Sequence, residues 1–143
     1  MVTLVRVITD GKPQMVSIDA LAPANVILKD VPCELSVYVK SAVKMNSSGV
    51  ASNALADILS NSNVIGIVES KPTTTTCNIR VLGTTEAIFS GLDVTKEYYL
   101  SDSVAGELTL TPPINSGSVR LKVGQPFSST EFLVIKGTRT VRA

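Results

Sequence analysis

Short runs of alternating apolar and polar residues fill most of the chain, and glycine, proline, asparagine and aspartate separate them. Such alternation indicates half-buried β-strands, because successive side chains of a strand point to opposite faces of its sheet. The clearest runs, between Val64 and Lys136, are VIGIVES, TTCNIRVLG, EYYLS, GELTL, SVRLKVGQ and EFLVIKG. The turn residues between them leave no room for a long helix. The chain is therefore predicted to be built from strands.

The N-terminal residues predict a β-hairpin. Residues 3–8 and 14–18 are two β-type runs, and Asp10-Gly11 between them suits a turn that needs positive φ. Pro13 falls at the start of the return strand, where a missing N–H is tolerated. Two interpretations of this hairpin remain open: it folds back on its own sheet, or it is an arm that pairs with another subunit.

Further strands are predicted along the rest of the chain. Residues 25–29, between Pro23 and Pro32, form at best a short strand, whereas residues 35–41, LSVYVKS, alternate over their centre. The later strands are predicted at residues 64–69, 75–82, 86–89, 97–101, 107–110, 119–124, 132–136 and 138–142, with Pro72 separating the first two. Among these, 97–101 should pair with 107–110 across DSVAG, 119–124 should pair with 132–136, and 138–142 should be an edge strand.

One segment, KMNSSGVASNALADILSNSN, carries a different pattern, because its apolar residues recur at helical spacing: Ala51, Ala54, Leu55, Ile58 and Leu59. It predicts one or two helical turns with Ser52 as N-cap. Regularly spaced short strands indicate a sandwich or barrel rather than βαβ units. The predicted fold class is therefore all-β: a β-sandwich or small barrel of about ten short strands, with at most one short helix.

The domain organisation has two interpretations. Residues 1–63 hold the hairpin and a docking segment, and residues 64–143 form a C-terminal β-module; the alternative is one continuous domain, because no composition break marks a linker. With 143 residues, the chain is long enough to bury a core. Aromatic residues are only 4% and tryptophan is absent, so this core must be mostly Val, Ile, Leu and Ala.

Composition limits the partners. A net charge of +1 argues against a general nucleic-acid binder, which needs clustered Lys and Arg. Five basic residues near the C-terminus face only Glu131 in sequence: Arg120, Lys122, Lys136, Arg139 and Arg142. They predict either a functional basic patch or a strand face that is solvated or meets acidic neighbours. The sequence shows no signal-peptide pattern and no long apolar run, so we expect a soluble protein, made in a reducing cytoplasm, that binds no membrane.

Residues that carry catalytic chemistry are sparse. The chain has no histidine, the side chain that most often serves as general acid or base. The candidates for paired carboxylates are Asp93, Glu97, Asp102 and Glu107, all in turn-rich segments typical of solvated loop charges. Asp102 and Glu107, in LSDSVAGE, offer too few oxygen ligands for calcium. We therefore expect no enzyme, no cofactor and no metal site, and the sequence does not identify partner-binding residues.

Cysteine, tyrosine and threonine residues have structural interpretations. Cys33 and Cys77 lack the spacing of a metal or redox motif and are expected to be reduced and buried, with a single disulfide as the alternative. Tyr98 and Tyr99 are adjacent, so on a strand one should be in the core and the other at the surface or an interface. The run of threonines at 73–76 is either a flat subunit contact surface or an ordinary polar start of a strand.

Three blocks of the second half support a comparison with a known family: VIGIVESKPTTTTCNIRVLG, FSGLDVTKEYYLSDSVAGELTLTPP and GSVRLKVGQPFSSTEFLVIKG. Together they resemble a small β-module of virion proteins of tailed bacteriophages, which include capsid decoration or head-fibre proteins and tail-fibre proteins. The recognisable parts are a hairpin of the form GL…YYLS…G.LT..PP and then a strand pair that ends in SSTEFLV. The resemblance covers roughly the C-terminal half and does not extend to residues 1–63.

The resemblance implies a non-enzymatic β-rich subunit, often a homotrimer, that binds other virion proteins. The expected function is a capsid decoration or cement protein that bridges major capsid subunits, located in the virion and made in the host bacterial cytoplasm. A tail-fibre or other tail-associated subunit is the alternative within this class. A carbohydrate-binding receptor-recognition module is the alternative from another class, and it needs a concave patch with Tyr38, Tyr98 or Tyr99 exposed near Asn or Asp side chains.

Overall fold

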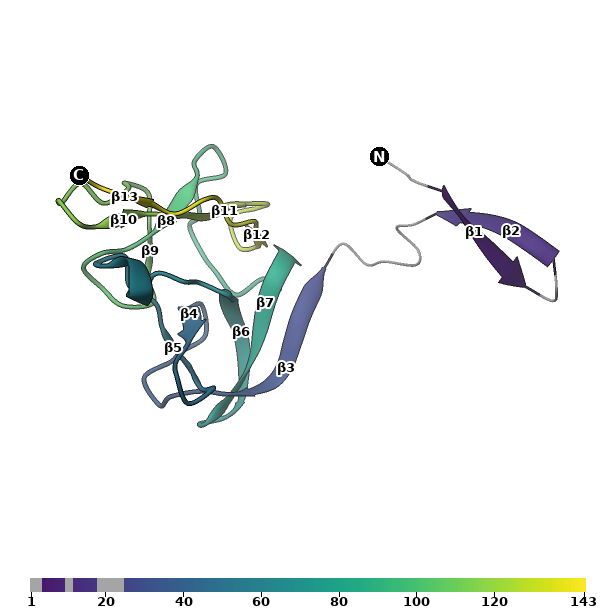
Figure 1. Ribbon diagram of the computed structural model, residues 1–143, viewed down its shortest axis with the longest axis horizontal. Coiled ribbons are helices and arrows are strands. Elements are labelled where there is room, and N and C mark those ends of the chain that lie inside the picture. Colours follow the sequence, from purple (N-terminus) through teal and green to yellow (C-terminus); the bar gives the residue numbers. More distant parts are fainter. Residues whose placement is uncertain (1–3, 10–11, 18–24) are drawn as a thin grey trace.

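A computed structural model of the protein describes residues 4–9, 12–17 and 25–143. The described residues are mostly β-structure, so the predicted all-β class is confirmed (Figure 1). The strands are β1 (Leu4–Thr9), β2 (Lys12–Ser17), β3 (Val26–Pro32), β4 (Ala42–Met45), β5 (Ala51–Asn53), β6 (Gly66–Thr73), β7 (Thr76–Thr84), β8 (Tyr98–Leu100), β9 (Leu108–Thr109), β10 (Val119–Arg120), β11 (Lys122–Pro126), β12 (Phe132–Val134) and β13 (Thr140–Val141). They outnumber the ten or so expected partly because the run predicted at 119–124 is divided between β10 and β11, and because β5 forms where a helix was predicted.

One curled antiparallel sheet of nine strands holds most of these elements (Figure 1). Its order is β5-β4-β6-β7-β12-β11-β8-β9, and β3 pairs with β7 outside this path. A bridge between Cys33 and Ala51 joins the residue after β3 to β5, so β3, β7, β6, β4 and β5 curl into a half-barrel. β10 and β13 form a small second sheet. The boundary considered at residue 63 falls inside the large sheet, because β4 pairs with β6 and β3 pairs with β7.

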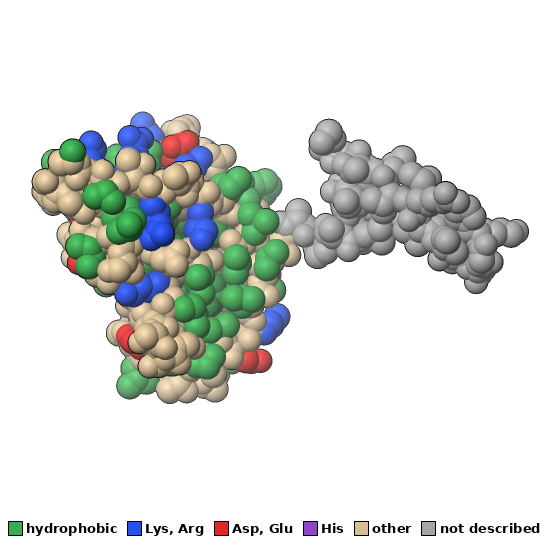
Figure 2. All heavy atoms as spheres, in the orientation of Figure 1, with side chains coloured by type: hydrophobic (Ala, Val, Ile, Leu, Met, Phe, Trp, Pro, Cys, Tyr) green, Lys and Arg blue, Asp and Glu red, His purple; other side chains and the backbone are tan. Residues whose placement is uncertain are grey.

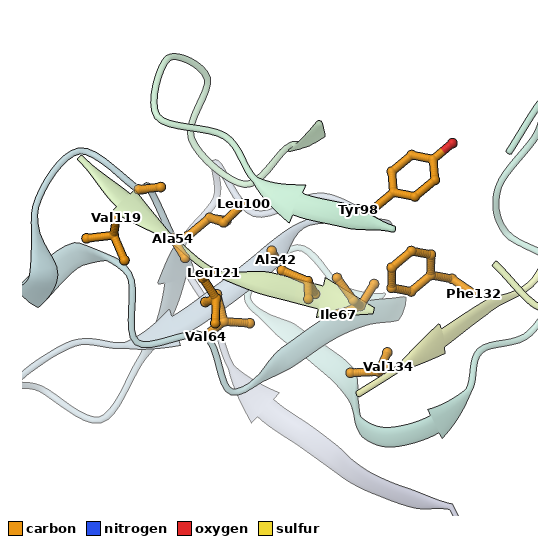
Figure 3. Packing of buried hydrophobic residues seen from close by; sticks show 12 residues of the cluster. Ala42, Ala54, Val64, Ile67, Tyr98, Leu100, Val119, Leu121, Phe132 and Val134 are labelled. Carbon is orange, nitrogen blue, oxygen red and sulfur yellow. The ribbon is translucent and has the colours of Figure 1, made fainter. Parts of the chain in front are cut away.

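Two clusters of buried side chains lie on the two faces of β6. Ile67 belongs to the larger cluster with Leu100, Val123 and Phe132, whereas the next residue, Val68, belongs to the cluster inside the half-barrel. This division follows from the alternation of side chains along a strand. Figure 3 shows the larger cluster, in which strands from both halves of the chain meet. Both clusters are dominated by aliphatic residues, as the composition predicted.

The N-terminal hairpin is present. β1 pairs with β2 in antiparallel register, from Leu4 opposite Ser17 to Thr9 opposite Lys12. The predicted turn at Asp10-Gly11 lies outside the described residues. β1 and β2 make a sheet of their own, so within the described strands the hairpin does not join the nine-stranded sheet.

The strand predicted at residues 35–41 is wrong. The segment forms successive turns, in which the N–H groups of Val37 and Ser41 bond to the carbonyls of Glu34 and Tyr38 at 3.1 and 3.0 Å. Lys40 adopts a φ of 85°, which ends any extended run. The apolar alternation continues into Ala42–Met45, and it is this later part that pairs as β4.

The helix predicted after Ser52 is also wrong. Residue 52 lies within β5, opposite Lys44 of β4, and cross-strand pairing replaces the expected N-cap. The helical content of this segment is one 3-10 turn, η1 (Leu59–Asn61). The apolar spacing does not mark one helix face: Ala51 and Ala54 are buried in different clusters, and Ile58 and Leu59 are exposed.

Other boundaries move by a few residues. β3 is longer than the predicted short strand at 25–29, and β6 continues through Pro72, where a register shift accommodates the missing donor. Residues 86–89 do not form a strand, although Ile88 and Phe89 pack against the larger cluster. The hairpin of β8 with β9 and the pair of β11 with β12 are confirmed. Within the described residues, no helix is long and apolar enough to cross a membrane.

Candidate functional site

Exposed apolar side chains gather on β3 and the end of β7. Val26 pairs with Leu82, and these two residues and Leu28 are 43%, 43% and 42% exposed. Figure 2 shows hydrophobic side chains gathered over the region where Figure 1 places β3, β6 and β7. We call residues 26–28 together with Leu82 the β3 edge. An apolar edge of this kind can accept a strand from another chain through main-chain hydrogen bonds.

The β3 edge ends at a bulge. The register with β7 shifts between Leu28 and Val31, and Asp30 has a φ of 52°. The Asp30 N–H bonds to the Asn78 side chain at 2.9 Å, which holds the bulge in place. A second register shift lies between Val26 and Ile27, and regular pairing with β7 holds only over Ile27 and Leu28 in this half of the strand. Bulges twist an edge away from further pairing, so a partner strand would fit best beside these two residues.

The second candidate is a cleft lined by residues of the turn at 37–41, the segment 89–92 and the β8–β9 hairpin. This cleft has a volume of about 220 Å³ and is lined mostly by apolar groups. We call it the Tyr38 cleft, after the aromatic side chain that is 40% exposed there. Its lining residues are Tyr38, Lys40, Phe89, Leu92, Tyr98, Gly106, Glu107 and Leu108. Sequence analysis singled out Tyr38, Tyr98 and Glu107 separately, but nothing in the local pattern showed that they meet.

The expected surface role for one of the paired tyrosines is wrong, because Tyr98 and Tyr99 are both buried. Tyr98 packs edge-on against Phe132, with ring centroids 5.8 Å apart. On the opposite strand face, the Arg120 guanidinium lies 5.3 Å from the centre of the Tyr99 ring and covers it. The Tyr99 hydroxyl donates to Glu97 at 3.1 Å.

The acidic candidates have separate hydrogen-bond partners or surroundings. Asp93 accepts hydrogen bonds from the hydroxyl and N–H of Thr95, which lower the pKa of its carboxyl. Asp102 accepts from the Ser118 hydroxyl at 2.9 Å, and Glu107 lies at the Tyr38 cleft. In the described part of the chain, no group of three or more His, Cys, Asp or Glu side chains is arranged to hold a metal ion.

Glu97 takes part in a surface ion pair. Its carboxylate lies 3.1 Å from the Lys122 ammonium, and that contact, with the Tyr99 hydroxyl next in importance, lowers the pKa of Glu97. Both partners are exposed enough for water to screen the pair, so it orders the side chains more than it stabilises the fold.

Glu131, the acidic residue that lies among the five basic residues in the sequence, accepts a hydrogen bond from Ser128 and has no salt bridge with them in the described residues. Each basic residue makes its own contact. Lys122 bonds to Glu97, and Arg120 stacks on Tyr99. The other three donate hydrogen bonds to backbone carbonyls: Lys136 to Val64, Arg139 to Leu59 and Arg142 to Pro113. Most of these cations thus tie separate segments together. The expectation of acidic neighbours is met by Lys122, which pairs with Glu97, and by Arg120, which is close enough to contribute to the lowered pKa of the same carboxylate.

The threonine run closes the β6–β7 hairpin. Thr73 pairs with Thr76, and their hydroxyls lie 2.8 Å apart. Thr74 and Thr75 therefore form the turn, and the Thr75 N–H bonds back to the Thr73 hydroxyl at 3.3 Å. These residues make a hairpin end rather than a flat strand surface.

Cys33 and Cys77 are free and buried in the half-barrel cluster, as predicted. Burial, followed by the neighbouring Cys33, raises the pKa of Cys77 to about 12. The reactive thiolate is therefore scarce at neutral pH.

We expect the stability of the fold to depend on this thiol at alkaline pH. The pKa of Cys77 is raised from 9.0 to about 12 on folding, so the neutral thiol is favoured in the native state. The stabilisation is complete below about pH 9 and is lost as the pH rises toward 12. Urea midpoints measured from pH 8 upward should fall in the wild type. The fall should be smaller in Cys77→Val. If the urea midpoint fell equally with pH in both proteins, the raised pKa of Cys77 would not be the cause.

Comparison with protein-family models, with curated proteins and with solved structures finds no match to this chain.

Proposed function

We propose that this protein is a structural subunit of a tailed-bacteriophage virion, and that it decorates the capsid by bridging major capsid subunits. The C-terminal sequence blocks, with their resemblance to a phage β-module, support the virion context. A structural rather than enzymatic role is part of the proposal. In this proposal the protein is made in the bacterial cytoplasm and assembles as a trimer.

The structural observation that carries the proposal is the β3 edge. It presents apolar side chains at the border of a sheet, directly after the N-terminal segment in sequence. Soluble proteins usually blunt such edges with charge, bulges or a covering segment. Here register shifts flank the pair Ile27 and Leu28 on both sides, but the exposed side chains of this half of the strand, Val26 and Leu28, are apolar and carry no charge. A capsid neighbour or a symmetry mate that supplies a strand would cover it.

Light scattering on the full chain and imaging of capsids that lack the protein, before and after mixing, test this function. A trimer that adds regularly across the head supports decoration. Binding at the tail or fibres instead would replace it with the tail-associated alternative. Failure to bind any part of the particle would overturn the proposal.

A charge on the β3 edge is expected to reduce binding. Leu28→Lys places an ammonium among the apolar contacts, at a position whose side chain is already exposed, so the fold should be retained. The matched control is Val94→Lys, another exposed apolar position in a loop away from this edge. Occupancy of particles, measured from the protein ratio in purified capsids, should fall for Leu28→Lys alone. Equal occupancy for both variants would mean that the β3 edge does not contact the capsid.

Deletion of residues 1–10 is expected to leave a folded protein that is incorporated poorly. The deletion removes β1, which pairs with β2 and with no strand of the nine-stranded sheet among those described. The melting temperature should therefore change little, whereas occupancy on particles should fall. Unchanged occupancy would exclude a docking role for this hairpin.

A further inference from the structure

We propose that the Tyr38 cleft binds a single pyranose ring of a carbohydrate. This inference is independent of the virion proposal, because it rests only on the geometry of the cleft.

The floor of the cleft offers an aromatic platform. Phe89, Leu92, Tyr98 and Leu108 make its lining apolar, and Tyr38, which also lines it, is 40% exposed. One face of a pyranose is covered by C–H groups, which pack well on such a surface. The cleft volume of about 220 Å³ is below the roughly 300 Å³ typical of sites for drug-sized ligands, which suits one ring.

The rim of the cleft supplies polar groups of both kinds. Lys40 is a donor and Glu107 an acceptor, and within the described residues neither side chain makes a hydrogen bond or ion pair. Burial, and then the Glu107 carboxylate, raise the pKa of Tyr38, so its hydroxyl stays protonated and can donate. Sugar hydroxyls both donate and accept, so they can bond to Lys40 and to Glu107. An apolar ligand would contact only the apolar lining and leave both groups without a partner.

The backbone around the cleft is held in conformations that are costly for ordinary residues. Lys40 has a φ of 85°, although it carries a side chain. Its N–H bonds to the Val68 carbonyl at 2.8 Å, and the Tyr38 N–H bonds to the Ser41 hydroxyl at 3.0 Å. Strained residues of this kind cluster at ligand clamps, where the surrounding structure holds them in place. The backbone that carries Tyr38 and Lys40 is therefore held in place by these hydrogen bonds.

The opposite wall requires glycine. Gly106 has a φ of 82°, and a Cβ at this position would lie 2.6 Å from the Asn53 side-chain oxygen. The close packing of this wall keeps Glu107 at the rim and adds to the preorganisation of the site.

Titration of the isotope-labelled full chain with free hexoses, followed by amide chemical shifts, tests the proposal. The probes are glucose, galactose, mannose and N-acetylglucosamine, added separately. At least one is expected to give saturable shifts at the amides of Lys40, Glu107 and their neighbours, with an affinity on the order of 1 mM for so small a ligand. Absence of saturable shifts for all four hexoses would overturn the proposal.

Substitutions in the cleft show whether the sugar binds there, and the conservative and control variants separate a loss of binding from a loss of folding. Tyr38→Ala removes the most exposed aromatic ring of the cleft and should weaken binding about tenfold or more, whereas Tyr38→Phe should keep most of it. Glu107→Gln changes only an exposed rim group and should also weaken binding. Ile114→Ala, an exposed position outside the cleft, is the control and should not change it. Retained binding in both Tyr38→Ala and Glu107→Gln would overturn the proposal, as would saturation of the cleft by phenylalanine amide and by no hexose.

Discussion

Replacing Phe132 with alanine is expected to lower the free energy of unfolding by about 3–5 kcal/mol. Phe132 is fully buried beside Tyr98 (Figure 3). Its ring centroid lies 5.8 Å from that of Tyr98 and 5.6 Å from that of Phe89. The substitution removes both aromatic contacts and leaves a cavity between β12 and β8. Because domains of this size are typically stable by only about 5–15 kcal/mol, the loss should be a large part of the total.

Urea unfolding followed by circular dichroism measures this loss. The matched control is Phe127→Ala, a change of the same side chain in the loop between β11 and β12, where the ring is 69% exposed. This control should stay within about 0.5 kcal/mol of the wild type. Similar losses in the two variants would mean that the cluster in Figure 3 does not dominate the stability of the fold.

Replacing Glu69 with alanine is expected to cost about 3–5 kcal/mol for a different reason, because it leaves a buried charge without its partner. The Glu69 and Arg80 side chains are only 6% and 11% exposed, and the Arg80 Nη2 lies 2.9 Å from one carboxylate oxygen and 3.0 Å from the other. The same carboxylate accepts the Glu86 N–H at 2.7 Å. Glu69 therefore ties together β6, β7 and the segment after β7.

A double variant separates the charge from the packing. Glu69→Leu combined with Arg80→Met should recover much of the loss, since apolar replacements of a buried ion pair are often neutral. Recovery should be incomplete, because the Glu86 N–H loses its acceptor. The exposed pair of Glu97 and Lys122 is the control, and Glu97→Ala should have a much smaller effect. A double variant less stable than Glu69→Ala would contradict the role of the unpaired charge.

Hairpins are the part of this fold that the sequence predicted best. Both the N-terminal hairpin and the pair of β8 with β9 join runs that are close in sequence, so turn residues and alternation are sufficient. The pairing of β3 with β7 has no local signal, because it joins residues far apart in the chain. The turn segment at 35–41 was misread for a related reason: its alternation is real, but hydrogen bonds to distant residues, such as that from the Lys40 N–H to Val68, fix it as turns.

The candidate sites also depend on contacts between distant segments, which the sequence does not signal locally. The single features of the Tyr38 cleft are visible in the sequence, but the cleft is assembled from three separate segments by the curl of the sheet. The exposure of the β3 edge could not be predicted, because residues 25–29 have the pattern of an ordinary short strand. Its exposure depends on pairing on one side only, with β7, which alternation cannot show.

The pairing of β3 with β7 also implies a delay during protein synthesis, in which β3 has emerged from the ribosome and β7 has not. Val26 leaves the ribosome more than 50 residues before its partner Leu82. At about 5–20 residues per second, this leaves roughly 3–10 s in which Val26, Leu28 and their neighbours have no partner strand. Nascent chains on neighbouring ribosomes expose the same apolar segment at the same stage, so they can aggregate through it. The yield of folded protein should therefore respond to translation rate and to chaperones that shield residues 26–32 until β7 emerges.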